Sequence, residues 1–238
     1  MTNADAGGSD TASRSASASA SALVLGVLVS GSGTNLQAVI DAVAAGRLRA
    51  KIGVVVSNIA TAKGLDRARA AGISTVVLDH KAYASREAFD GAVVHALRSH
   101  GATCVVLAGF MRLITRVLLD AFPQRVVNIH PSLLPAFPGA HSQAQALAYG
   151  VRVTGCTVHL VDAGMDTGPV LAQSAVPVLD DDTEETLRDR ILVEEHALLP
   201  TVLQWIADGR VEVVPGVPGA PGAAARPRVR IAPAAASR

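Results

Sequence analysis

Apolar runs alternate with helical patterns along the first half of the chain. Leu23–Ser30 is an apolar run, and apolar residues then recur at helical spacing from Leu36 to Val43. The alternation continues with apolar runs at 52–56, 75–78, 104–108 and 126–129 and with helical patterns at 62–71 and 86–99. Continuous apolar strands separated by helices are typical of a sheet buried on both faces. The pattern therefore predicts an α/β fold with a mostly parallel sheet and helices on both faces.

The alternation changes in the second half of the chain. Thr157–Val161 and Val170–Val178 are apolar runs separated by a short Gly/Asp loop without a helix. They are expected to be adjacent strands, so the last part of the sheet is predicted to be antiparallel. Asp181-Asp182-Thr183-Glu184 is a helix-start signal, with Glu184 three residues after Asp181. The helix is predicted to continue to about Ile206, with a bend near Pro200.

Composition narrows the class of protein. The chain has 238 residues, half of them hydrophobic, which suits one domain with a substantial core. The formal net charge is +1, and no nucleic acid or membrane-surface partner is indicated. Cys104 and Cys156 lie far apart in apolar stretches, which predicts core residues in a reducing compartment, with no disulfide or metal site. We therefore expect a cytoplasmic protein.

The two ends differ in composition from the centre. Residues 1–22 are rich in Ser, Ala and Gly and are interpreted as a disordered leader, since no secretory signal pattern is present. Residues 23–214 form the predicted domain. Residues 215–238 are a low-complexity Pro/Ala/Gly tail with a possible short terminal strand. Val211–Val214 and Arg228–Ile231 are candidates to pair as a hairpin.

A glycine loop follows the first predicted strand. Gly31-Ser32-Gly33-Thr34-Asn35 leads into the first helix, where free N–H groups suit an anion. The loop lacks the third glycine and the acid of a dinucleotide site, and it lacks the Gly-Lys-Ser/Thr ending of a triphosphate loop. A monophosphate fits better, although a purely structural tight turn is an equal alternative.

Polar side chains meet at the end of the 126–129 run. Asn128 and His130 are two apart on a strand and should project to the same side. An amide donor beside a histidine is useful next to a developing oxyanion, although a structural cap is the simpler interpretation. Asp166, in the Gly/Asp loop, could meet His130 and relay a proton, or the loop is a solvated turn. His159 lines the same site or is a hydrogen-bonded core histidine.

Four segments together resemble the phosphoribosylglycinamide formyltransferases. They are Ser30–Leu36, Gly109–Arg112, Asn128–Pro135 with Phe137-Pro138-Gly139, and Asp162–Pro169, in matching order across about residues 23–208. The resemblance implies a Rossmann-like formyltransferase fold. It also implies transfer of a formyl group from 10-formyltetrahydrofolate, without a metal, to glycinamide ribonucleotide in purine biosynthesis. Small-molecule partners and a monomer or homodimer are expected.

The resemblance also implies roles for individual residues. Asn128, His130 and Asp166 match the catalytic trio, with Asp166 assisting proton transfer. Gly33, Thr34 and Asn35 match the loop that holds the ribosyl phosphate, and Glu195 matches the acid near the glycinamide. The folate-contacting positions are matched by Arg86, Met111, Arg112, Leu113, Ile114, Asn128, Asp162, Ala163, Gly164, Met165 and Asp166.

Three alternatives remain from the sequence. A 10-formyltetrahydrofolate hydrolase and a methionyl-tRNA formyltransferase share the formyl chemistry, but each normally carries a further domain. The hydrolase motif also tends to have His-Ser-Phe where this chain has Pro131-Ser132-Leu133. A non-catalytic phosphate-ligand-binding protein would keep the glycine loop but does not need Asn128, His130 and Asp166 together.

Overall fold

The computed structural model describes residues 22–217 and 225–234 of the chain. The predicted leader and the middle and end of the predicted tail therefore lie outside the described residues. One sheet contains seven strands in the order β3-β2-β1-β4-β5-β6-β7. The strands are β1 Leu23–Val29, β2 Ala50–Ser57, β3 Thr75–Val77, β4 Cys104–Leu107, β5 Val126–His130, β6 Val153–Leu160 and β7 Val170–Pro177.

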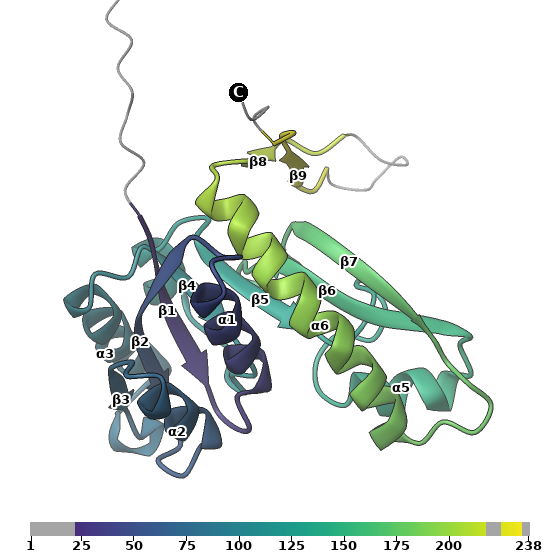
Figure 1. The fold of residues 1–238 in the computed structure, drawn as a ribbon, viewed down its shortest axis with the longest axis horizontal. Coiled ribbons are helices and arrows are strands. Elements are labelled where there is room, and N and C mark those ends of the chain that lie inside the picture. The colour runs from purple at the N-terminus through teal and green to yellow at the C-terminus, as the bar shows by residue number, and fades with distance from the viewer. Residues whose placement is uncertain (1–21, 218–224, 235–238) are drawn as a thin grey trace, which may run out of the picture.

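The sheet confirms the predicted fold class. The pairs β1–β2, β1–β4, β2–β3 and β4–β5 are parallel, whereas β5–β6 and β6–β7 are antiparallel. Parallel strands need crossover helices, and the chain supplies them between the first five strands. After β6 the chain returns through a short loop, so β7 runs antiparallel at the edge (Figure 1).

Helices cover both faces of the sheet (Figure 1). One face packs against α1 Thr34–Ala44, α2 Lys63–Ala70 and α6 Glu184–Ala207, through side chains such as Leu36, Leu65 and Leu203. The other face packs against α3 Arg86–Ser99 and α4 Arg116–Ala121, through Phe89 and Leu118. Burial of this aliphatic surface is the main source of stability in a core with few aromatics.

The start of α6 corrects one sequence prediction. The N-cap is Thr183, whose side chain accepts a hydrogen bond from the Thr186 backbone N–H, while the Thr186 side chain accepts from the Thr183 N–H. Thr183 and Thr186 therefore form the capping box that the sequence assigned to Asp181 and Glu184. Asp182 is instead paired with Arg190, one to two turns into the helix. The helix continues through Pro200 to Ala207.

Two short helices were not predicted. They are α4 and α5 Ser142–Tyr149, and α5 packs against α6. A 3₁₀ turn also spans His80–Ala82. The α5 helix begins after His141, which has a positive φ of 58°. The six residues of α4 make fewer than two turns, too few for a clear hydrophobic period.

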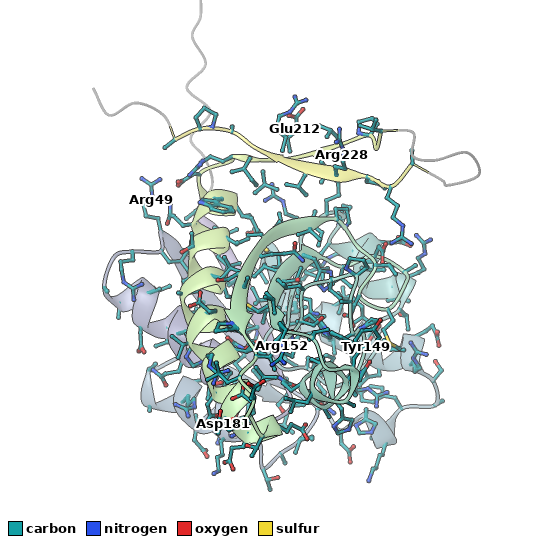
Figure 2. The ribbon with its side chains drawn as sticks, turned by 90° about the vertical axis from the view of Figure 1, so that its right-hand side faces the viewer. Arg49, Tyr149, Arg152, Asp181, Glu212 and Arg228 are labelled. Atoms are coloured by element: carbon teal, nitrogen blue, oxygen red, sulfur yellow. The ribbon has the colours of Figure 1, made fainter. Side chains whose placement is uncertain are left out.

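A terminal hairpin joins β8 Val211–Val214 to β9 Arg228–Ile231. The two strands pair antiparallel, as considered from the sequence, and Val211, Val213 and Val229 pack against the core at the end of α6. Figure 2 shows Glu212 and Arg228 on this hairpin at one end of the molecule, with Asp181 at the opposite end. Among the described residues, no helix is long and apolar enough to cross a membrane.

The two cysteines are core residues, as predicted. Cys104 and Cys156 are free thiols with no exposed surface. Burial raises the pKa of each thiol to about 12. A thiol with so high a pKa is a poor nucleophile, so neither cysteine is a candidate for covalent chemistry.

Candidate active site

The end of β5 carries the two polar side chains singled out from the sequence. Asn128 and His130 are two residues apart, so they project from the same face of the sheet, opposite to Ile129 and its core contacts. His130 is only 5% exposed. On the neighbouring antiparallel strand β6, His159 lies opposite Asn128 and Thr157 opposite His130. The sheet register therefore brings two histidines and an amide together.

Both ring nitrogens of His130 face oxygen atoms. Nε2 lies 2.9 Å from the backbone oxygen of Phe137. A carbonyl oxygen only accepts, so Nε2 carries a hydrogen and donates it. Nδ1 lies 3.4 Å from Oδ2 of Asp166. Each ring nitrogen of His130 thus has an oxygen atom nearby, one on the backbone of Phe137 and one on the carboxylate of Asp166.

Asp166 reaches His130 from the loop between β6 and β7. Its backbone has a positive φ of 52°, and its Oδ2 accepts a hydrogen bond of 2.8 Å from the Gly139 N–H. Oδ1 of the same carboxylate lies 3.7 Å from Nε2 of His159. The side chain is 13% exposed, so this is not the solvated turn that was the alternative from the sequence.

His159 belongs to the same cluster. It is 1% exposed, and its two ring nitrogens lie 3.1 Å from Nδ2 of Asn128 and 3.0 Å from the backbone oxygen of Leu160. Burial is the main cause that lowers the pKa of His159 below its ordinary value. The alternatives left open by the sequence therefore both apply: the ring lines the site and is a hydrogen-bonded, buried histidine.

The glycine loop is held against two other segments. Ser30 Oγ donates to Asn58 and accepts from the Met111 N–H, and the Gly64 N–H donates to the Gly31 oxygen. Gly33 has a φ of +68°, and a Cβ on it would lie 2.5 Å from Cα of Gly64. Glycine is thus required at position 33 both by conformation and by close approach. The first N–H groups of α1 open beside this loop, as at any helix start.

Arg67 adds a cation to this loop, and the sequence analysis missed it. Its Nε donates 2.9 Å to the Ser32 oxygen, and its Nη1 lies 3.3 Å from Oε1 of Gln37. A cavity of about 310 Å³ opens beside the guanidinium; it is lined by Thr34, Gln37, Ala38, Asp41, Arg47, Arg67 and His196. Within the described part of the chain, Nε2 of His196 is buried without a hydrogen-bond partner. Arg67 belongs to α2, so the sequence alone does not show that its side chain reaches the glycine loop. The packing of α2 against the loop brings it there.

Glu195 is buried beside the start of α1. It is 4% exposed, and its Oε2 accepts a hydrogen bond of 2.7 Å from Nδ2 of Asn35. Burial raises the pKa of this carboxyl to about 7. The side-chain amide nitrogen of Asn35 is thus occupied by Glu195. Glu195 and the glycine loop, both assigned to one substrate, are in direct contact.

The segments expected to contact a folate are exposed loops. Arg86 donates to the Leu113 oxygen across 3.3 Å, and the Arg112 guanidinium lies 5.2 Å from the Phe89 ring centre. Ile114 is partly buried against the same core, whereas Met111 is 78% exposed. The segment therefore presents both arginine and apolar side chains after β4.

The 162–166 segment is an internally bonded turn. Oδ1 of Asp162 accepts from the Gly164 N–H at 3.0 Å and from the Thr167 hydroxyl at 2.6 Å. These bonds shape the loop that delivers Asp166 to His130, with Ala163 and Gly164 at its exposed tip. Met165 is half exposed beside Asp166. The loop thus combines an apolar surface with the buried carboxylate.

Comparison with known proteins places the site in a family context. The sequence model described as Formyl transferase matches residues 24–203. Phosphoribosylglycinamide formyltransferase of Escherichia coli (strain K12) is 44% identical over 187 residues, covering 79% of this chain and 88% of that protein. The protein of that name from Mycobacterium tuberculosis is 47% identical over 188 residues, covering 79% and 86%. The crystal structure of glycinamide ribonucleotide transformylase 1 from Symbiobacterium toebii superposes with a TM-score of 0.82 at 50% identity, covering 89% and 95%.

Proposed function

Because the chain belongs to the formyl transferase family, we propose that it transfers a formyl group from 10-formyltetrahydrofolate to the amine of 5-phosphoribosylglycinamide. The product is the formylated ribonucleotide of purine (IMP) biosynthesis. The observation that carries the proposal is the convergence of Asn128, His130 and Asp166 at the carboxyl end of β5. Ligands of open α/β sheets bind at such strand ends.

The reaction begins with attack of the neutral amine on the formyl carbon. A new C–N bond forms, and the carbonyl oxygen becomes an oxyanion. An N–H of Asn128 donates to this oxyanion, and one such donor lowers a barrier by about 2.7–4 kcal/mol. The imidazolium of His130, whose two ring nitrogens face Phe137 and Asp166, stabilises the oxyanion by its charge. The bond from the formyl carbon to the folate N10 then breaks. This chemistry needs only donors and a proton carrier, so the proposal includes no metal.

Asp166 keeps the charged histidine in place. Its carboxylate faces Nδ1 at 3.4 Å, a distance that is expected to shorten when ligands close the site. The attacking amine must lose a proton and the departing N10 must gain one. Asp166 and His130 together carry that proton from the amine to the folate nitrogen, so the step is balanced without another base.

The phosphoribosyl end of the substrate extends toward the glycine loop. The first N–H groups of α1 and the guanidinium of Arg67 form a cationic end for the phosphate. Glu195 contacts the Asn35 side chain beside this loop and so lies along the path between phosphate and amine. The folate lies against the exposed loops at 111–114 and 162–166, with Arg86 supporting the first of them.

Transfer to an amine is favoured over hydrolysis by the phosphate end of the site. A hydrolase uses water as acceptor and has no need of the glycine loop, Arg67 and Glu195 as a connected surface. A non-catalytic binding protein has no need of the three converging side chains. The buried free thiols favour a reducing cytoplasm, and a monomer or homodimer stays a prediction.

An acceptor-dependence assay tests the proposal. The protein is incubated with 10-formyltetrahydrofolate, with and without glycinamide ribonucleotide, while tetrahydrofolate release and amine formylation are followed. We expect both only when the ribonucleotide is present. Release of folate and formate without the amine would support the hydrolase. Binding of both ligands without turnover would support the non-catalytic protein.

A further inference from the structure

His159 faces the amide of Asn128 across the β5–β6 pair. The two residues are register partners, and the ring lies in the interior at 1% exposure. Its ring nitrogens meet two different groups: the backbone oxygen of Leu160 at Nδ1 and the side-chain nitrogen of Asn128 at Nε2. One ring nitrogen thus faces an acceptor and the other faces an amide nitrogen, so the two have different hydrogen-bonding roles.

The Leu160 contact decides the tautomer of the ring. A backbone carbonyl only accepts hydrogen bonds, so Nδ1, at 3.0 Å, carries the hydrogen. Burial lowers the pKa of His159 and outweighs the Leu160 hydrogen bond and the Asp166 and Asp162 charges, which raise it; the nearby His130 also lowers it. The neutral ring therefore prevails at neutral pH. A neutral ring with a hydrogen on Nδ1 has an unprotonated Nε2, which accepts.

An accepting Nε2 selects one orientation of the Asn128 amide. With Nδ2 at 3.1 Å, an N–H of the amide points at the lone pair of the ring. The flipped amide would place Oδ1 against that lone pair, and two acceptors would face each other in a buried site. The other oxygen nearby, Oδ1 of Asp166 at 3.7 Å, is also an acceptor and offers Nε2 no hydrogen.

From this geometry we propose that His159 is a positioning residue for formyl transfer: it holds Asn128 so that an N–H, and not the carbonyl oxygen, faces the reacting formyl oxygen. One N–H of the amide is used by His159, and the second is left for the oxyanion. The flipped amide would instead direct an acceptor toward a developing negative charge, which is destabilising. The inference rests on the proposed function, because it assigns His159 to the same reaction.

A double-mutant cycle tests this role. His159→Leu removes the acceptor, and Asn128 can then rotate freely. We expect kcat to fall on the order of tenfold with little change in either KM, because the amide can still rotate back; loss of the donor in Asn128→Ala costs about a hundredfold or more. In the Asn128→Ala background, His159→Leu should cost less than about twofold, since no amide remains to be held. His159→Gln keeps an acceptor and should restore kcat to within about threefold of the unsubstituted protein.

A matched control separates positioning from general stability. Val158→Ala alters the adjacent residue of β6, which faces the opposite side of the sheet and its core. Val158→Ala should lower the melting temperature but should not lower kcat as His159→Leu does. A His159→Leu effect that is unchanged in the Asn128→Ala background, or an unchanged kcat in His159→Leu, would overturn the inference.

The tautomer can be measured without any variant. In the ¹⁵N-labelled protein, we expect the His159 imidazole to show a protonated Nδ1 and an unprotonated Nε2 at pH 7 to 8. A protonated Nε2 would overturn the inference even if His159→Leu does not fold. Absence of formyl transfer by the unsubstituted protein would instead refute the proposed function, and the tautomer measurement would still test the hydrogen-bond assignment.

Discussion

The side chain of Asn35 donates a hydrogen bond of 2.7 Å to the carboxyl of Glu195, although 160 residues separate the two. The bond joins the first turn of α1 to the middle of α6. Glu195 is 4% exposed, and burial raises its pKa to about 7, partly offset by the bond from Asn35. A buried carboxyl with one donor is costly to ionise, and this cost can be measured as a dependence of stability on pH.

Glu195→Gln should change how stability varies with pH. The folded state holds the Glu195 proton up to a pKa of about 7, whereas the ordinary pKa of a glutamate side chain is 4.5. The contribution of Glu195 to the free energy of unfolding is therefore fully present below pH 4.5. It is lost as pH rises through 7, by up to about 3 kcal/mol. Glutamine does not titrate, so the variant should gain stability relative to the unsubstituted protein between pH 5 and pH 8.

Denaturant unfolding at several pH values measures this difference. Glu185→Gln, an exposed position on the same helix, serves as the control and should show no such trend. A difference between the Glu195→Gln and unsubstituted proteins that stays constant from pH 5 to pH 8 would contradict the raised pKa.

Gly33→Ala should be destabilising, whereas Gly31→Ala should not. Alanine at 33 would adopt a φ of +68° and would place its Cβ 2.5 Å from Cα of Gly64. The strained backbone costs about 1–2 kcal/mol, and the steric overlap adds to it. At Gly31 a Cβ meets no heavy atom within 4 Å and the φ is not positive. Thermal unfolding of both variants checks this, and equal melting temperatures would show that the loop can relax.

Arg67→Ala should weaken binding of the ribonucleotide. A guanidinium contact to phosphate contributes about 1.5–3 kcal/mol, so its loss should raise KM for the ribonucleotide about ten- to a hundredfold. KM for the formyl folate and kcat should change little. Arg69→Ala is the control, because Arg69 lies on the same helix but is exposed and paired with Asp66. Steady-state kinetics with each substrate varied in turn measures both KM values. An unchanged KM for the ribonucleotide would remove Arg67 from the phosphate site.

The sequence predicted those parts of the fold that depend on local pattern. Helix α3 has the predicted bounds of 86–99, and the parallel strands with their antiparallel end follow from apolar runs and short loops. The capping box of α6 was assigned two residues too early, because Asp181, Asp182 and Thr183 are all good N-cap residues. Only the tertiary pairing of Asp182 with Arg190 distinguishes them.

The site was predictable where it follows a strand end and less so where it depends on packing. Asn128 and His130 share a face by strand alternation alone. That Phe137 accepts from His130 depends on a positive φ of 52° at Phe137, which no local pattern indicates. Arg67 likewise reaches the glycine loop only because Gly33 and Gly64 let α2 pack closely against it.

His130→Ala should remove most turnover and leave the fold intact. The variant loses the charged group beside the oxyanion and the proton carrier, which together account for about 10²–10⁴ in kcat. His95→Ala, at an exposed position on α3, is the control and should keep full activity. Single-turnover rates together with thermal unfolding separate chemistry from folding. Turnover equal to that of the His95→Ala variant would exclude His130 from the mechanism.

Asp166→Asn should lower the rate of formyl transfer. Asparagine tolerates the positive φ of 52° at this position and can still accept from the Gly139 N–H, so the loop is expected to stay in place. The change removes the negative charge that faces Nδ1 of His130 at 3.4 Å. His130 then lacks the carboxylate that takes part with it in moving the proton from the amine to the folate, so kcat should fall on the order of tenfold or more.

Asp181→Asn provides the matched control, because it makes the same substitution at an exposed aspartate. Asp181 lies near the start of α6, at the end of the molecule opposite the hairpin (Figure 2). The kcat of this control should equal that of the unsubstituted protein. For Asp166→Asn, the loss of kcat is expected without a matching loss of thermal stability, because the loop keeps its hydrogen bond from the Gly139 N–H. An unchanged kcat would exclude Asp166 from the reaction.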